Sequence, residues 1–238
     1  MVKLTIDGKA IESKEGKTII QAASDNNIVI PTLCYNEELT PTGSCRVCVV
    51  EVIADGVSTL VSSCDTPVKE GIEVYTNSEN AIKARKYAIQ MLYSQNSEAP
   101  AIRALAGKYN ITEKLPVEES ECIGCGRCYK VCSEVVERKC IDMSVGGLSN
   151  MNEKLSVKWN FDNCIACGAC AYVCPTHAVS IHDEDGVRTM ITPNAKHEFS
   201  MKKCSDCGKY YAPNVQIEWM KEKTGLSDDK FDRCMDCR

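Results

Sequence analysis

Short alternating runs of apolar and polar residues dominate the first eighty positions. Lys3–Ile6 alternates as a β-strand does, Asp7-Gly8 is a strong hairpin signal, and Lys9–Ser13 returns as a second strand. The composition of Thr18–Asp25 favours a helix. Further strands are expected at Val47–Ile53, Val57–Val61 and Ile72–Tyr75. This order of elements predicts a β-grasp fold.

The pattern changes to helical spacing after this segment. Apolar residues recur at helical intervals over Asn77–Tyr93, with Ser78 as a candidate cap. A looser stretch, Ser94–Ser120, predicts a linker with a short helix at Ala101–Tyr109. Later patterns predict a loop at Gly146-Gly147, a strand at Leu155–Trp159, and a hairpin of Ala178–His182 with Val187–Ile191 around Asp183–Gly186. The chain is therefore expected to be α+β.

Eight of the 17 cysteines form two matching C-x2-C-x2-C-x3-C runs, 122–132 and 164–174. This is the bacterial ferredoxin spacing, in which three cysteines hold one [4Fe–4S] cubane and the fourth reaches the other cubane. The predicted ligand sets are Cys122, Cys125, Cys128 and Cys174 for one cluster, and Cys164, Cys167, Cys170 and Cys132 for the other. Electron transfer is the function that two such clusters indicate.

Disulfides and zinc are the competing explanations for these two runs. Disulfides need an oxidising compartment, and the N-terminal residues lack the apolar core of a signal peptide, so we expect reduced thiols in the cytoplasm. Zinc needs four ligands and gives no reason for a duplicated run of eight cysteines. The pattern therefore favours two cubanes.

Four more cysteines lie in the predicted β-grasp segment. Cys34, Cys45, Cys48 and Cys64 have the spacing C-x10-C-x2-C-x15-C, and Gly43-Ser44 precedes the close pair, where backbone amides can approach cluster sulfurs. Taken alone, this set also suits zinc. Beside two cubane runs and a β-grasp strand pattern, it predicts a [2Fe–2S] cluster.

These motifs together resemble the iron–sulfur subunits of soluble NADH-linked oxidoreductases. The resemblance covers roughly 1–191 and extends to the N-terminal part of the large iron–sulfur subunit of respiratory complex I and to the diaphorase subunit of bidirectional hydrogenases. It implies a flavin-containing NAD(P)H-oxidising partner, a further redox subunit or ferredoxin as second partner, and no catalytic residue in this chain. A complex that bifurcates electrons is one assignment compatible with it.

The chain departs from that family in two places. Family members commonly carry another cubane, held by one histidine and three cysteines, but no cysteine occurs between Cys64 and Cys122 here. The second departure is a C-terminal tetrad of two C-x2-C pairs, Cys204, Cys207, Cys234 and Cys237. Structural zinc, a third cubane and a labile dithiol switch all remain open for the tail, and zinc is preferred.

Composition excludes some functions. The net charge of −5 disfavours a nucleic-acid surface, no apolar stretch is long enough to span a membrane, and no glycine-rich nucleotide-binding motif occurs. Cys140 is left over and is expected to be a buried thiol, with a substitute ligand as the alternative. The three histidines, His177, His182 and His197, show no ligand spacing.

We therefore predict four segments: a [2Fe–2S] β-grasp domain with its packing helix at 1–93, a linker at 94–120, a 2[4Fe–4S] ferredoxin domain at 121–195, and a zinc-knuckle-like tail at 196–238. The expected function is a non-catalytic electron-transfer subunit. The alternatives are a free multi-cluster carrier, a metal or redox sensor, and a succinate dehydrogenase or fumarate reductase subunit, whose first spacing should be C-x4-C-x2-C.

Overall fold

A computed structural model describes residues 1–144 and 156–238, and these group into two compact units, 1–126 and 127–238. The loop predicted at Gly146-Gly147 and the start of the strand predicted at Leu155 lie outside the described residues. The four predicted segment boundaries stay predictions.

The N-terminal unit contains a five-stranded sheet with the order β2-β1-β5-β3-β4. Its strands are β1 (Val2–Ile6), β2 (Lys9–Ser13), β3 (Val49–Ala54), β4 (Val57–Ser62) and β5 (Glu73–Tyr75). Asp7 and Gly8 both have positive φ, as the tight turn between β1 and β2 requires. β1 pairs in parallel with β5, whereas the other pairs are antiparallel. The predicted α+β fold with an N-terminal β-grasp domain is confirmed.

One helix, α1 (Ile19–Asp25), packs its apolar face against this sheet. At its start the Gln21 side chain accepts a hydrogen bond from the Thr18 amide at 2.9 Å, which satisfies an amide outside the helix ladder. Ile19, Ala22 and Ala23 of the helix are buried with strand residues such as Ile6, Val50 and Val74. Cys48 and Cys64 belong to the same buried cluster, so the core holds two of the four predicted [2Fe–2S] ligands in place.

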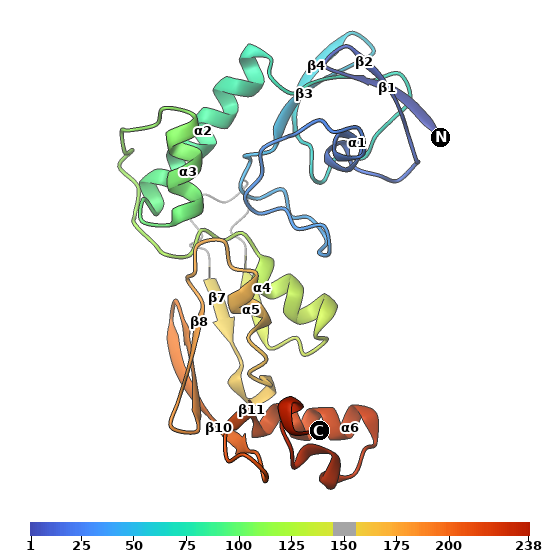
Figure 1. The fold of residues 1–238 in the computed structure, drawn as a ribbon. Coiled ribbons are helices and arrows are strands. Elements are labelled where there is room, and N and C mark those ends of the chain that lie inside the picture. The colour runs from blue at the N-terminus through green and yellow to red at the C-terminus, as the bar shows by residue number, and fades with distance from the viewer. Residues whose placement is uncertain (145–155) are drawn as a thin grey trace. The chain divides into compact units, whose positions relative to one another are not determined.

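Two further helices, α2 (Glu79–Gln95) and α3 (Pro100–Lys108), complete this unit and lie side by side (Figure 1). Ser78 caps α2 by accepting a hydrogen bond from the Ala81 amide at 3.2 Å, as its place in the sequence predicts. A second buried cluster joins the two helices to the loops before β3: Leu33, Cys34, Cys45, Val47, Ile89, Leu92, Ala99, Ile102 and Ala106. The segment predicted as a linker therefore contributes α3 to the packing around Cys34 and Cys45.

The C-terminal unit begins with α4 (Arg127–Lys130) and a π-helical turn (Val131–Val135), and a third short helical turn, α5 (Ala169–Tyr172), follows later in the chain. β6 (Ile141–Ser144) pairs with β7 (Ser156–Trp159). A four-stranded antiparallel sheet has the order β11-β10-β9-β8 and contains β8 (Ser180–Glu184), β9 (Val187–Thr192), β10 (Ala195–Lys203) and β11 (Tyr210–Pro213). The predicted hairpin is the β8–β9 pair, with its turn at Asp185-Gly186.

The C-terminal segment continues this sheet. β10 pairs with β9 on one side and β11 on the other, and α6 (Asn214–Thr224) packs against both β10 and β11. Three 3₁₀ turns also occur in the unit, at Phe161–Asn163, Asp228–Phe231 and Met235–Cys237. Among the helices of residues 1–144 and 156–238, none combines the length and apolar character needed to cross a lipid bilayer.

Candidate metal centres

The four cysteines of the β-grasp domain lie in two thiol pairs. Cys34 shares a side-chain hydrogen bond with Cys45, and Cys48 shares one with Cys64. All four side chains are buried. A [2Fe–2S] cluster takes four cysteines, two on each of its irons. The paired arrangement fits this cluster, with one pair for each iron, and the ligand assignment remains a prediction.

Each pair is electrostatically prepared to hold one thiolate. The hydrogen bond from Cys45 lowers the pKa of Cys34 to about 6, and the hydrogen bond from Cys64 lowers the pKa of Cys48 to about 7. The same bonds, together with burial, raise the pKa values of Cys45 and Cys64. Thiolates are the metal-binding form of cysteine, so each pair presents one ready ligand and needs to release one more proton when iron binds.

The loop before β3 brings hydroxyl groups to this site. Ser44 and Thr42 both hydrogen-bond the Cys34 thiol. Gly43 between them has a φ of +61°, and an added Cβ would lie 2.1 Å from Oδ2 of Asp65. Glycine is therefore required both for the backbone conformation and for the close approach. The Gly43-Ser44 sequence predicts backbone amides near sulfur here, and the structure adds the two side-chain hydroxyls.

The same loop contacts the first cubane run within the N-terminal unit. Thr42 and Ser44 donate hydrogen bonds to the backbone carbonyl of Cys125 at 3.2 and 3.4 Å. The carbonyl of Cys122 accepts a bond of 3.0 Å from Gln95 at the end of α2. A short polar bridge therefore joins Cys34 to Cys125. Cys128 and Cys174, the other two predicted ligands of this cubane, belong to the C-terminal unit, and this ligand set stays a prediction.

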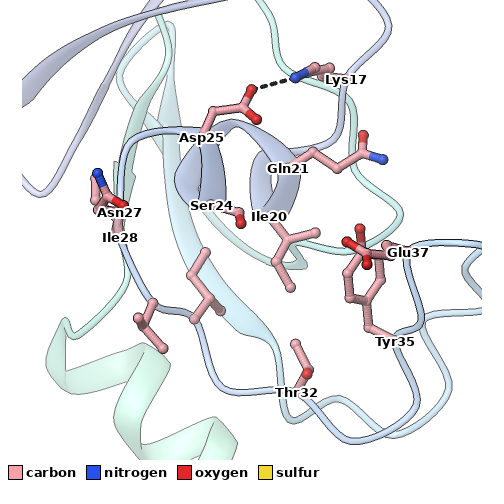
Figure 2. A pocket seen from close by; sticks show the side chains of 12 residues that line it. Lys17, Ile20, Gln21, Ser24, Asp25, Asn27, Ile28, Thr32, Tyr35 and Glu37 are labelled. Atoms are coloured by element: carbon pink, nitrogen blue, oxygen red, sulfur yellow. Dashed lines mark hydrogen bonds and ion pairs between the residues drawn. The ribbon is translucent and has the colours of Figure 1, made fainter.

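A hollow of about 610 Å³ lies beside the loop that carries Cys34. Figure 2 shows α1 on one wall and Thr32 and Tyr35 on the other, with Lys17 paired to Asp25 at the rim. Its twelve lining residues include no glycine, and therefore no glycine-rich loop of the kind that cradles phosphates.

Five thiols line one apolar cavity in the C-terminal unit, where the second cubane needs four. The cavity is lined by Cys132, Cys140, Cys164, Cys167 and Cys170, together with apolar residues including Val131, Ile165 and Met190. Four of these are the predicted ligands of the second cubane. The fifth, Cys140, was predicted as a buried thiol, with a substitute ligand as the alternative; it is buried, and it lies among the predicted ligands.

Cys140 contacts two of the predicted ligands. Its Sγ lies 3.2 Å from the Sγ of Cys132, and it hydrogen-bonds Cys164. The hydrogen bond from Cys140 lowers the pKa of Cys132 to about 6, assisted by backbone amides of residues 139–141, whereas burial raises the pKa of Cys170 to about 12. The amides directed at Cys132 favour its thiolate form, with Cys140 as the donor beside it, and the ligand assignment stays a prediction.

We expect Cys140 to replace Cys132 when the latter is removed. The variant Cys132→Ser should retain about ten irons per chain, whereas Cys132→Ser/Cys140→Ser should fall to about six, because one [4Fe–4S] cluster is lost. Iron and sulfide analysis after anaerobic purification measures this, with Cys140→Ser alone as the control that keeps all predicted ligands. A loss of four irons from the Cys132→Ser single variant would contradict the expectation.

The C-terminal tetrad is the most compact thiol group. The Sγ atoms of Cys204, Cys207, Cys234 and Cys237 all lie within 4.8 Å of one another, and the Cys207 and Cys234 sulfurs are 3.7 Å apart. The Cys234 amide donates to the Cys204 sulfur at 3.3 Å. Backbone amides, with that of Cys207 first, lower the pKa of Cys204 to about 6, and the thiol of Cys234 raises the pKa of Cys237 to about 12.

Local backbone geometry explains how the two C-x2-C pairs meet. Gly208 takes a φ of +71° directly after Cys207, and its amide bonds the Cys204 carbonyl at 3.1 Å, which closes the first knuckle. The Ser205 amide donates to the Asp232 carbonyl at 2.8 Å, which ties the two knuckles together. The buried ring of Phe231 precedes the second knuckle. Sequence spacing therefore identified four residues that the fold brings into one group.

The histidines lie apart from these thiol groups. His197 stacks on Phe161 with the ring centroids 4.7 Å apart, and His182 lies 3.5 Å from the Ser180 hydroxyl. Among the described residues, no histidine belongs to a group with metal-binding spacing.

Comparison with known proteins agrees with the domain content that the motifs predict. Residues 1–79 match the family model described as a 2Fe-2S iron-sulfur cluster binding domain, and residues 115–182 and 163–209 match two models described as 4Fe-4S dicluster domains. The chain therefore carries an N-terminal 2Fe-2S domain followed by a 4Fe-4S dicluster region.

Curated relatives include subunits of NAD(P)-linked enzymes. NADPH-Fe(3+) oxidoreductase subunit alpha of Geobacter sulfurreducens is 34% identical over 74% of this chain and 24% of its own length. NADP-reducing hydrogenase subunit HndD of Solidesulfovibrio fructosivorans is 32% identical over 77% of this chain and 36% of its own length. The chain thus spans about a quarter to a third of these relatives.

A solved structure, that of NAD+-reducing [NiFe]-hydrogenase in the H2-reduced state, has a similar fold. One of its chains superimposes with a TM-score of 0.52 at 24% identity, over 63% of this chain and 73% of that chain. This likeness concerns the fold alone. The expected resemblance to the iron–sulfur subunits of NADH-linked oxidoreductases and hydrogenases is confirmed by the family models and the curated relatives together.

Proposed function

We propose that this chain, which resembles the iron–sulfur region of NADH-linked oxidoreductase and hydrogenase subunits, relays single electrons between two protein partners. One partner is a flavin-containing subunit that oxidises NAD(P)H, and the other is a catalytic subunit or a ferredoxin. The setting is a cytoplasmic complex, and electron bifurcation is one activity that such a complex could carry out. The chain itself contributes no catalytic residue.

The observation that carries this proposal is the polar bridge between two cluster loops. The Thr42 and Ser44 hydroxyls lie within hydrogen-bonding reach of both the Cys34 thiol and the carbonyl of Cys125. Cys125 also packs against the buried cluster that contains Cys34 and Cys45. The [2Fe–2S] loop therefore abuts the first cubane run directly, which supports a relay that works without the histidine-ligated cubane common in the family.

Iron–sulfur clusters supply one-electron chemistry when bound, over a wide range of potentials. The residues of this chain hold their thiolates, exclude water by burial, and direct amides and hydroxyls at the sulfurs, which favours the reduced state of a cluster. Cys48 and Cys64 are almost completely buried at one end of the site, while Ser44 and Thr42 approach Cys34 at the other.

For the C-terminal tetrad we propose zinc. Four thiolates at about 2.3 Å from a tetrahedral zinc lie about 3.8 Å from one another, and the Cys207 and Cys234 sulfurs are 3.7 Å apart. A cubane needs its four thiolates farther apart, because each binds a different iron. The cofactor content we propose is therefore one [2Fe–2S] cluster, two [4Fe–4S] clusters and one structural zinc.

Anaerobic purification of the tagged chain from its native cells tests the subunit assignment. We expect a flavoprotein to copurify in a fixed ratio, with bound flavin and NAD(P)H oxidation activity. The control is a tagged chain that lacks residues 1–79. This shortened chain should not copurify the flavoprotein if the 2Fe-2S domain provides the docking surface. A stable monomer that carries clusters and no flavoprotein would favour the free carrier instead.

A further inference from the structure

Arg85 is an unusual residue for the position it occupies. It lies on α2, one helical turn before Ile89, on the face that packs against the cluster loops. Its side chain is fully buried and is the largest of the fully buried side chains in the described part of the protein. Arginine is almost never fully buried unless it is paired.

The guanidinium group holds the backbone on both sides of a predicted cluster ligand. Nε donates to the carbonyl of Val47 at 3.0 Å, and Nη2 donates to the carbonyl of Val49 at 2.7 Å. Nη2 also donates to the carbonyl of Thr76 at 2.9 Å, and Nη1 to the hydroxyl of Tyr109 at 3.3 Å. Val47 and Val49 are the two neighbours of Cys48, so the guanidinium is tied to the backbone on both sides of this cysteine.

The acceptors are all uncharged. Three carbonyls and one phenol satisfy the donors, and within residues 1–144 and 156–238 no carboxylate forms an ion pair with Arg85. An arginine keeps its positive charge in proteins, and a buried charge is costly unless an opposite charge compensates it. The hydrogen bonds therefore leave the charge of Arg85 without a counter-ion of its own.

A [2Fe–2S] cluster with four thiolates provides that counter-charge. It is a dianion when oxidised and gains a further negative charge on reduction. A fixed cation in a low-dielectric interior stabilises the more negative state more strongly, so it raises the reduction potential. The effect is stronger inside a protein than at a surface because water and salt screen a buried pair less.

We propose that Arg85 is the counter-charge of the [2Fe–2S] centre and sets its reduction potential through the loop around Cys48. Arg85 is a positioning residue, because it acts on the cluster through charge and through the carbonyls of Val47 and Val49. This role rests on the [2Fe–2S] assignment for Cys34, Cys45, Cys48 and Cys64, and it extends that assignment to a residue outside the cysteine motifs.

A redox titration of the whole chain, followed by the electron paramagnetic resonance signal of the [2Fe–2S] cluster, tests the proposal. In Arg85→Met the reduced-to-oxidised ratio at the wild-type midpoint potential should fall about tenfold, a shift of about −59 mV for one electron. Arg85→Lys keeps the charge and should restore most of the potential. The signals of the two cubanes should keep their midpoints in every variant.

Arg103→Met is the matched control, since Arg103 is exposed on α3 and paired with Glu98 at 3.0 Å. An unchanged or higher midpoint in Arg85→Met would overturn the proposal. If the methionine variant does not retain the cluster, Arg85→Lys and Arg85→Gln are compared instead, and equal midpoints in these two would overturn it. A wild-type chain with no [2Fe–2S] signal would contradict the cluster assignment itself, whereas failure to find a flavoprotein partner would leave the potential shift unaffected.

Discussion

Replacing Cys204 with serine is expected to remove the C-terminal metal and leave the iron of the chain in place. Cys204 is buried, and its sulfur accepts the Cys234 amide at 3.3 Å, so it anchors both knuckles. Structural zinc contributes on the order of 10 kcal/mol to the folding of small zinc domains, so its loss should unfold the two knuckles. Metal analysis should show a change from about one zinc to none, with about ten irons retained.

Ser205→Ala is the matched control, because Ser205 is the exposed neighbour of Cys204 and its side chain bonds only Asp206. It should keep the zinc. Limited proteolysis should then cut the Cys204→Ser variant within 204–238 while β8 and β9 stay protected. If Cys204→Ser loses about four irons and the wild type contains no zinc, the tail holds a cubane and the zinc assignment is wrong.

Replacing Cys48 with serine is expected to abolish the [2Fe–2S] cluster selectively. Cys48 is buried in the core of the β-grasp domain, paired with Cys64, and flanked by the two carbonyls that Arg85 holds. A serine hydroxyl is a much poorer iron ligand than a thiolate, so the site loses one of its four predicted ligands. The chain should lose about two of ten irons and the [2Fe–2S] resonance signal.

The control for this variant is Ser58→Ala on β4, whose hydroxyl bonds Glu51 away from the cysteines. Both cubane signals and the tail zinc should persist in Cys48→Ser. Electron flow through the assembled complex should fall by at least about tenfold if the [2Fe–2S] centre is part of the relay. Retention of the [2Fe–2S] signal in Cys48→Ser would contradict the ligand assignment.

Regular elements with strong local signals were predictable from sequence. The β1–β2 hairpin follows from alternation around Asp7-Gly8, and α2 follows from apolar spacing after Ser78. Cysteine spacing likewise predicted the tail group, because a metal tetrad brings two C-x2-C pairs together whatever the intervening fold. In these cases a short stretch of sequence, or the spacing of one residue type, determines the local structure.

Other features were missed for different reasons. The tail was expected as a separate knuckle, but β10 pairs with β9 across the short turn at Pro193-Asn194 and so extends the β8–β9 hairpin into a larger sheet. Cys140 lies outside both C-x2-C-x2-C-x3-C runs, so its contact with the Cys132 sulfur was not predictable from cysteine spacing. The sequence pattern of α2 does not distinguish Arg85 from the other polar residues of this helix. Its burial becomes visible only in the structure, where its side chain donates to the carbonyl of Val47. Periodicity alone does not reveal such contacts.

The most direct test of the relay is rapid freeze-quench spectroscopy of the intact complex after mixing with NAD(P)H. If this chain is the relay, its [2Fe–2S] and cubane resonance signals should appear at least as fast as the complex turns over with its final acceptor. In Cys48→Ser the acceptor should be reduced at least about tenfold more slowly while the flavin is still reduced at the wild-type rate. Turnover at full speed while the clusters of this chain stay oxidised would contradict the account.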